Sequence, residues 1–226
     1  MIPVRQETIP PVPSTSPPRM PDGARRTSPG VRSPSRSVER DGRRTASAAR
    51  LVVVSGCSSG GKSALLEELA RRGHRTVEEP GRRVVRFELE RGGGALPWKD
   101  TTAFARRCAE RSLADYAAAT GSPGLVFFDR SFIDAYAALR SAGISDLDDL
   151  REAIAVFRFV PVVFLAPPWK AIYVTDGERR HGFEEAKAEY LRLKACYPAC
   201  GYRIFELPRT DVATRAEFVL DRVAGA

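Results

Sequence analysis

The sequence lacks any apolar run long enough to cross a lipid bilayer. A membrane-spanning helix needs roughly 20 consecutive apolar residues, and no stretch of the 226-residue chain approaches that length. The first residues, MIPVRQETIPPVPSTSPP, also have no apolar core of the kind found in secretory signals. These absences predict a cytoplasmic protein with no membrane partner.

Cysteine is scarce, with four residues in the chain. Cys196 and Cys200 stand four positions apart, and no second pair of cysteine or histidine residues lies near them. Structural zinc sites need such a second pair, so the spacing does not indicate zinc. Because no secretion signal is present, we expect free thiols rather than disulfides.

Residues 1–49 contain almost no Leu, Ile or Phe, but they hold nine of the 17 prolines and many Ser and Arg residues. This composition cannot bury enough apolar surface to offset the entropy lost on ordering, so it predicts a disordered Pro/Ser/Arg-rich leader. Nine arginines against four acidic residues here account for most of the net charge of +8. Clustered arginines can contact nucleic acid or an anionic membrane, but no aromatic stacking residue accompanies them. The near-neutral remainder argues against a nucleic-acid partner.

Residues 50–226 alternate strand-like and helix-like patterns, with Asp100 and Ser145 as expected helix caps. Apolar runs predict strands at 51–55, 75–78, 125–128, 161–165 and 202–207, and helices at 62–73, 80–91, 100–120, 132–141, 146–157, 184–197 and 212–223. The alternation predicts one three-layer α/β/α domain around a five-stranded parallel sheet. Ligands of such sheets bind at the carboxyl ends of the strands, where the polar motifs of this chain fall.

The first motif lies between the first strand and the first helix and reads Gly56-Cys57-Ser58-Ser59-Gly60-Gly61-Lys62-Ser63. It fits G-x-x-x-x-G-K-[ST] at every position. Glycines let the backbone curve until its N–H groups face phosphate oxygens, and the helix adds its positive end. We expect Lys62 to reach the β- and γ-phosphates of ATP and Ser63 to hold Mg²⁺. The alternative is a Gly/Ser-rich turn with a surface lysine.

The third strand ends in Asp129-Arg130. A carboxylate at this edge of the sheet lies near the phosphate loop and can bind Mg²⁺ or act in catalysis, so Asp129 is a candidate for both. The alternative is that Asp129 caps the helix that starts near Phe132. Arg130 is expected either to contact a phosphate or acceptor, or to form a structural salt bridge.

The second strand is followed by Glu78-Glu79-Pro80-Gly81-Arg82-Arg83. A carboxylate here can accept a proton from an acceptor hydroxyl, and Glu79 is the candidate base, with Glu78 left open. Arg82 and Arg83 can grip an anionic acceptor through forked hydrogen bonds. The alternative is ordinary chemistry at a helix start, with proline and acids near its positive end.

A glycine-flanked charged segment at 176–182 separates the fourth strand from a long helix. This is where a mobile lid closes over a triphosphate in phosphoryl-transfer enzymes. Arg179 and Arg180, not distinguished from each other, are the candidates that would stabilise the transferring group. The alternative is an exposed charged turn.

Over residues 51–223 the chain resembles the P-loop kinase-like AAA-domain predicted ATPases, a family related to the bacterial ribosylnicotinamide kinase domain. The resemblance includes the phosphate loop, VEEPGRRVV, FFDRSFIDA and VFLAPPWKAIYVTDGERRHGF. It implies a nucleotide-kinase-like fold with a lid, without fixing one reaction. Glu79-Pro80 and Asp129-Arg130-Ser131 also look like acceptor-side motifs of deoxynucleoside kinases, where the acid acts as base and the arginine grips the acceptor. Those kinases often have Glu where this chain has Asp129.

Together these features predict a small-molecule kinase that uses ATP and Mg²⁺ to phosphorylate a nucleoside-like acceptor. The absence of a guanine-specific N-K-x-D pattern favours ATP over GTP. The alternative is a nucleotide-binding switch or regulatory ATPase that has no small-molecule acceptor. A nucleic-acid-associated factor that uses the basic leader is the third interpretation. The sequence identifies neither the acceptor nor the oligomeric state.

Overall fold

The computed structural model of the protein describes residues 49–173 and 182–225. The predicted leader, apart from its last residue, and the predicted lid arginines Arg179 and Arg180 lie outside the described residues.

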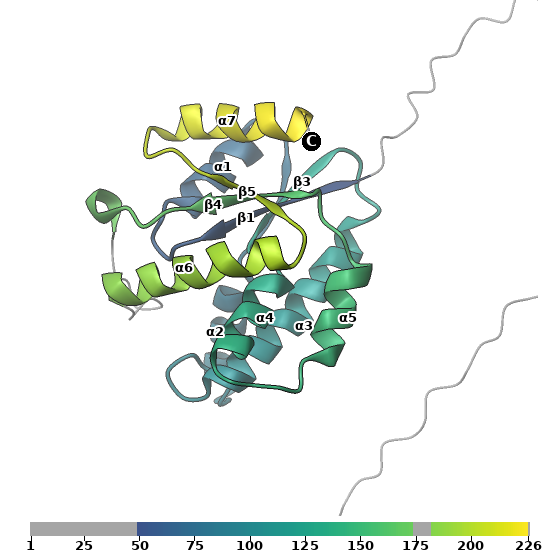
Figure 1. The fold of residues 1–226 in the computed structure, drawn as a ribbon, viewed down its shortest axis with the longest axis vertical. Coiled ribbons are helices and arrows are strands. Elements are labelled where there is room, and N and C mark those ends of the chain that lie inside the picture. The colour runs from purple at the N-terminus through teal and green to yellow at the C-terminus, as the bar shows by residue number, and fades with distance from the viewer. Residues whose placement is uncertain (1–48, 174–181, 226) are drawn as a thin grey trace, which may run out of the picture. The chain divides into compact units, whose positions relative to one another are not determined.

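Five strands form one parallel sheet in the order β2-β3-β1-β4-β5 (Figure 1). The strands are β1 (Arg50–Gly56), β2 (Arg75–Val77), β3 (Leu125–Asp129), β4 (Val162–Ala166) and β5 (Arg203–Glu206). The central strand β1 pairs with β3 on one side and β4 on the other. Because every pairing is parallel, the carboxyl ends of all five strands lie along one edge. The predicted five-stranded parallel sheet is confirmed.

Helices cover both faces of the sheet and give the predicted three layers (Figure 1). One face is covered by α1 (Lys62–Arg71) and α7 (Val212–Ala224). The other face carries α2 (Pro80–Glu90), α3 (Thr101–Ala119), α4 (Phe132–Ser141), α5 (Asp148–Val156) and α6 (Phe183–Ala199). A short 3-10 turn, η1 (Lys170–Ile172), follows β4.

The core lies on both faces of the sheet, because successive side chains of a strand point to opposite sides. In β1, Val52 and Val54 belong to the cluster shared with α1 and α7. Leu51 and Val53 belong to the larger cluster beneath the other helices. Burial on both faces explains why the strand reads as an unbroken apolar run rather than an alternating one.

Two predicted caps have opposite outcomes. The side chain of Asp100 accepts a hydrogen bond from the Ala103 N–H, as a helix cap does. The predicted cap by Ser145 is wrong, because α5 starts at Asp148 and its N-cap is Leu147, which makes no side-chain cap. Asp148 and Asp149 stand in the first turn of α5, where negative charge meets the positive helix end.

The chain leaves β1 for α1 on one face of the sheet and leaves β3 for α4 on the other (Figure 1). Such a change of direction between neighbouring parallel strands opens a crevice at their carboxyl ends. The phosphate loop and the Asp129-Arg130 pair therefore stand on the two sides of this crevice.

Candidate active site

The loop Gly56–Ser63 presses against the end of β4. Gly56 has φ +113°, and a Cβ placed there would lie 2.4 Å from the carbonyl oxygen of Ala166. The Cys57 N–H donates to that same carbonyl oxygen at 2.9 Å. Gly61 is the N-cap of α1 and has φ +74°. Both positions need glycine, since L side chains rarely adopt such backbone angles and the first also leaves no room.

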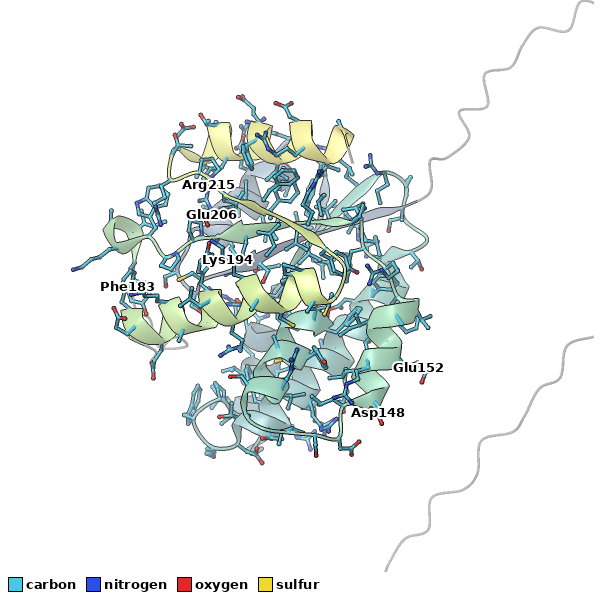
Figure 2. All side chains as sticks on the ribbon, in the orientation of Figure 1. Asp148, Glu152, Phe183, Lys194, Glu206 and Arg215 are labelled. Carbon is cyan, nitrogen blue, oxygen red and sulfur yellow. The ribbon has the colours of Figure 1, made fainter. Side chains whose placement is uncertain are left out.

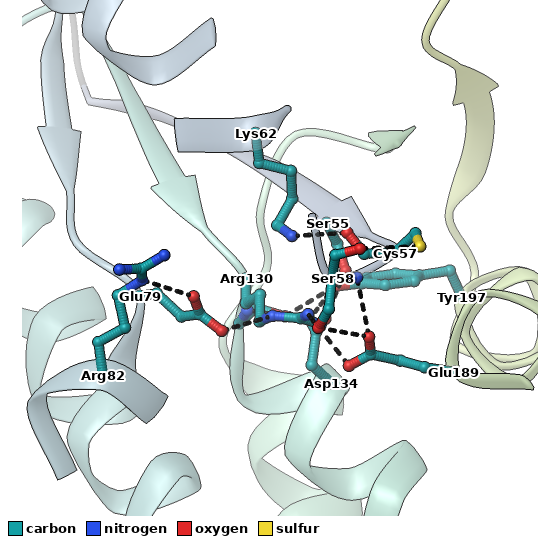
Figure 3. Close-up of polar contacts among 11 residues, drawn as sticks. Ser55, Cys57, Ser58, Lys62, Glu79, Arg82, Arg130, Asp134, Glu189 and Tyr197 are labelled. Carbon is teal, nitrogen blue, oxygen red and sulfur yellow. Dashed lines mark hydrogen bonds and ion pairs between the residues drawn. The ribbon is translucent and has the colours of Figure 1, made fainter. Parts of the chain in front are cut away.

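Lys62 is buried and spans the loop, where its Nζ donates to the Cys57 carbonyl oxygen at 3.0 Å (Figure 3). Within the described residues, the start of α1 has no side-chain cap and no acid in its first turn. An uncapped helix start offers N–H groups and partial positive charge to an anion. Lys62 and the start of α1 can therefore act together on one anion.

Arg215 fixes the other side of the loop, and sequence reasoning missed it. It extends from α7 (Figure 2) and donates to the carbonyl oxygens of Gly60 at 3.0 Å and Gly61 at 3.2 Å. Its side chain is 2% exposed, and burial lowers its pKa. A buried arginine that bonds two loop carbonyls turns the N–H groups of the loop toward the opposite side. No local motif marks it, because it lies about 150 positions from the loop in the sequence.

A cavity of about 640 Å³ opens beside the loop. The phosphate-loop residues that line it include Lys62 and Ser63, and its far wall is made by Trp169, Ile172 and the residues around Asp211. The guanidinium of Arg215 lies 5.9 Å from the centre of the Trp169 ring. The cavity thus has one end formed by Lys62 and Ser63 and a wall with aromatic and apolar side chains.

Arg130 is the centre of a charged cluster on the opposite side of the loop (Figure 3). Its guanidinium lies 2.9 Å from Glu79, 3.3 Å from Asp134 and 3.0 Å from Glu189. Arg130 is 8% exposed and has a left-handed backbone, φ +70°. Glu189, from α6, also accepts from the Ser58 N–H at 3.1 Å. The cluster therefore links β3, α2, α4 and α6 to the phosphate loop.

Asp134 organises the start of α4. Its carboxylate accepts from the Ser131 N–H at 2.9 Å and from the Tyr197 hydroxyl at 2.5 Å, and it also accepts from the Ser55 hydroxyl. Ser131 is the N-cap of α4 and forms a capping box with Asp134. The cap is therefore Ser131 and not Asp129, which removes the helix-cap alternative for Asp129. The S-x-x-D spacing is the signal that would have identified Asp134 from the sequence.

The structure distinguishes the two acids that follow β2. Glu78 is exposed and pairs with Arg86, whereas Glu79 bonds Arg130 and lines a second cavity. Burial raises the pKa of Glu79, but the nearby Arg130, Lys62 and Arg82 lower it more, so the net shift is downward. Glu79 is therefore ionised at neutral pH and able to accept a hydrogen bond.

Arg82 and Arg83 of α2 have different surroundings. Arg82 lines the second cavity and pairs with Glu79 at 3.4 Å. Arg83 forms a forked ion pair with Asp115 of α3, with Nη1–Oδ1 at 3.0 Å. That pair joins α2 to α3, and of the two arginines only Arg82 lines the cavity. An acceptor contact by Arg83 stays a prediction.

The second cavity measures about 360 Å³. Its polar end is formed by Ser58, Glu79, Arg130 and Glu189, and its walls are apolar side chains that include Val85, Phe104 and Leu193. Arg192 of α6 also lines it, and sequence reasoning missed both Arg192 and Glu189. The phosphate loop thus lies between two cavities, with Ser58 on the smaller one and Ser59 on the larger.

Asp129 ends β3 with a buried carboxylate. Its Oδ1 is buried and accepts no hydrogen bond from the described residues. Burial raises the pKa of this carboxyl to about 7, against the opposing effect of Lys62. No cluster of three or more His, Cys, Asp or Glu side chains is placed to hold a metal among residues 49–173 and 182–225. A magnesium ion on phosphates needs only one or two protein ligands, so one carboxylate and the Ser63 hydroxyl fit it.

A sequence profile described as "AAA domain" matches residues 51–215. The chain belongs to the AAA-domain family. The predicted family is confirmed on a match that covers well over half of the chain. Curated proteins gave no significant match to this sequence.

Solved structures share the fold of this AAA-domain chain. Deoxyadenosine kinase from M. mycoides, with dCMP and dCDP bound, is 14% identical with a TM-score of 0.60, over 78% of this chain and 100% of that one. NadR in complex with NR is 24% identical with a TM-score of 0.60, over 77% of this chain and 50% of that one. Shikimate kinase from Acinetobacter baumannii, in complex with shikimate, is 14% identical with a TM-score of 0.50. The match covers 78% of this chain and 94% of that one. The predicted kinase-like fold is confirmed.

None of the helices within residues 49–173 and 182–225 combines the length and the apolar character that a bilayer crossing requires.

Proposed function

We propose that the protein is a P-loop kinase that transfers the γ-phosphoryl group of ATP to a hydroxyl of a small, nucleoside-like acceptor. The observation that supports this most is the position of the phosphate loop between two cavities. One cavity contains Lys62 and Ser63, and the other contains the Glu79 carboxylate and the Arg130 guanidinium. A nucleotide in the first and an acceptor in the second would meet across the loop.

On the nucleotide side, the chain supplies positive charge and N–H donors. Lys62 would leave the Cys57 carbonyl and bind the β- and γ-phosphates, as a phosphate-loop lysine does. The cavity beyond Ser63 is large enough for the nucleoside part, with Trp169 and Ile172 as its wall. Because the loop is held by Arg215 before any ligand arrives, little reorganisation would be needed on binding.

On the acceptor side, Glu79 would accept a hydrogen bond from the attacking hydroxyl and take its proton as transfer proceeds. Its lowered pKa keeps it ionised for that task. Arg130 would hold the Glu79 carboxylate in position and place positive charge beside the γ-phosphate. Arg82 lines the same cavity, and we expect it to contact the acceptor from α2.

The metal ligands would be Ser63 and Asp129. Held there with the nucleotide, Mg²⁺ would offset negative charge on the phosphates. The buried Oδ1 of Asp129, which accepts no hydrogen bond from the residues that the structure describes, supports this assignment, because a buried carboxylate oxygen without a partner is costly unless a ligand satisfies it.

A nucleotide switch without an acceptor is the alternative. The second cavity favours the kinase, because a switch has no need for an apolar pocket that ends in a carboxylate beside the phosphate loop.

A metabolite screen on the purified full chain tests the proposal, with thermal shift and ADP release read together. We expect slow ADP formation from Mg·ATP alone and a large stimulation by the right acceptor. Lys62→Ala should abolish both rates. A protein that binds ATP but gives no stimulation with any acceptor that raises its melting temperature would support the switch instead.

A further inference from the structure

The end of α6 places two thiols against each other. Cys196 and Cys200 lie four residues apart, and their Sγ atoms are 4.0 Å apart, within hydrogen-bonding distance for sulfur. Cys196 is buried and Cys200 is half-buried. Cys57 and Cys108 are both buried and make no sulfur–sulfur contact with the described residues. Among the described cysteines, Cys196 and Cys200 are therefore the pair with sulfur atoms in contact, and Cys200 is the member that is partly exposed.

We propose that Cys196 and Cys200 form a redox-active dithiol that peroxides oxidise to a disulfide, and that this oxidation alters the acceptor side of the active site. Cys200 is the attacking thiolate and Cys196 the resolving thiol. The second half of the inference rests on the proposed function, while the thiol chemistry does not depend on it.

The surroundings of the two thiols give them different pKa values, which favours Cys200 as the nucleophile and Cys196 as the resolving thiol. The hydrogen bond from the Cys196 thiol lowers the pKa of the Cys200 thiol to about 7, with help from Arg158 and Arg140 and against the effect of burial. The same bond, together with burial, raises the pKa of the Cys196 thiol. A thiol with a pKa near ambient pH combines a useful thiolate fraction with high nucleophilicity.

Oxidation would run in two balanced steps. The Cys200 thiolate attacks one oxygen of hydrogen peroxide, the O–O bond breaks, and with one proton taken up the products are a sulfenic acid and water. The Cys196 sulfur then attacks the sulfenic sulfur, the S–O bond breaks, and the Cys196 proton leaves with the hydroxyl as a second water. The two thiols have together lost two electrons and two protons to one peroxide molecule.

The last turn of α6 can accommodate the bond. Residues four apart on a helix have Cβ atoms about 5–6 Å apart, whereas a disulfide needs about 3.5–4.5 Å. The turn must therefore tighten by on the order of 1–2 Å. Pro198 lies inside this turn and has no N–H to donate to the preceding turn, and Cys200 is already the C-cap. The Cys200 N–H donates to the carbonyl oxygens of Cys196 and Tyr197, both at 3.1 Å, and these bonds can persist because the tightened turn draws the same residues together.

Tyr197 transmits the movement to the site, because it lies in the turn that tightens. Its hydroxyl donates to Asp134 at 2.5 Å and lies 3.0 Å from the Ser131 hydroxyl. Asp134 in turn holds Arg130, which holds Glu79 (Figure 3). A displacement of Tyr197 therefore loosens the carboxylate that orients Arg130, on the acceptor side and away from Arg215.

Peptide mass spectrometry after peroxide treatment of the full chain tests the dithiol. Trypsin cleaves after Lys194 and Arg203, so both cysteines fall in one peptide. We expect this peptide to lose about 2 Da, the mass of two hydrogens, and to regain it with a dithiol reductant. Cys57 and Cys108 should still be alkylated in full. Oxidation of those two at the same rate, or no mass loss in the 195–203 peptide, would overturn the proposal.

Two variants assign the roles. Cys196→Ala should stop at a sulfenic acid on Cys200, trapped by a dimedone adduct, and Cys200→Ser should leave Cys196 unmodified. Because Cys200 is half-buried, its variant should fold even if the Cys196 variant does not. A dimedone adduct on Cys196 in the Cys200→Ser protein would reverse the assignment and refute it.

The coupling to the site has two readouts. Hydrogen exchange should rise at residues 131–134 in the oxidised protein, whether or not the chain is a kinase. If an acceptor is found, the oxidised protein should show a raised KM for the acceptor and an unchanged KM for ATP. A disulfide that leaves both the exchange rates and the acceptor KM unchanged would refute the coupling.

Discussion

Replacing Arg130 with alanine should destabilise the protein far more than replacing a surface arginine. The guanidinium lies within 3.3 Å of the Glu79, Asp134 and Glu189 carboxylates and is almost fully buried. Removing one partner of a buried ion pair costs about 3–5 kcal/mol, because the remaining charge has no compensation. Typical domains have only about 5–15 kcal/mol of stability. We expect Arg130→Ala to lower the free energy of unfolding at pH 7 by about 3–5 kcal/mol.

The pKa values of the neighbouring carboxylates predict how the loss of stability in Arg130→Ala changes with pH. Burial raises the pKa of Glu79 and Glu189, but Arg130 leads the charges that lower it more, so both pKa values lie below the ordinary 4.5. Their contribution to stability is present above that value and is lost as the pH falls through the lowered folded pKa. Without Arg130, burial and mutual repulsion dominate and the folded pKa values rise. The loss of stability in Arg130→Ala should therefore shrink as the pH falls from 7 to 5.

Urea unfolding of both proteins at pH 7 and pH 5 measures these differences. Arg86→Ala is the control, because Arg86 pairs with Glu78 at the surface and such pairs contribute at most about 1 kcal/mol. The reasoning fails if Arg130→Ala costs no more than Arg86→Ala, or if its deficit grows on acidification.

Further predictions concern neighbouring residues with unequal roles. Glu79→Gln should lower acceptor-dependent kcat by about 10²–10⁴-fold, as loss of a general base does. Glu78→Gln should leave kcat near that of the parent protein. Equal effects of the two variants in the kinetic assay would contradict the role given to Glu79. Gly56→Ala should prevent folding or nucleotide binding, whereas Gly73→Ala, also at positive φ but with open space around it, should cost only about 1–2 kcal/mol by thermal unfolding. Arg215→Ala should weaken ATP binding in calorimetry without changing the acceptor KM, and an unaltered ATP affinity would show that the loop does not depend on it.

The fold could be predicted from the sequence because each local signal agreed with the whole. Apolar runs such as Leu51–Val54 are strands buried on both faces. The glycine-rich pattern that follows this strand is typical of a phosphate loop. The ends of elements were less certain. Ser145 was expected to cap a helix that in fact begins three residues later, because capping residues also favour ordinary turns.

The site was predicted in part, and the difference has a physical origin. Lys62, Glu79 and Arg130 lie in the segments that follow the carboxyl ends of β1, β2 and β3, and parallel topology brings these ends together. Glu189 and Arg215 lie within helices, and their positions depend on how those helices pack, which a local pattern does not specify. The ion pair of Arg83 with Asp115 could not be predicted, because the two residues are far apart in the chain. The roles of Arg179 and Arg180 stay predictions.

Transfer of a labelled phosphoryl group tests the central claim most directly. ATP labelled at the γ-phosphate would be incubated with Mg²⁺, the full chain and the acceptors that raise its melting temperature, and the products would be separated. The account predicts label in a phosphorylated small molecule, dependent on Lys62 and Glu79. Label that remains in ATP or appears only as free phosphate, with every acceptor the protein binds, would contradict it.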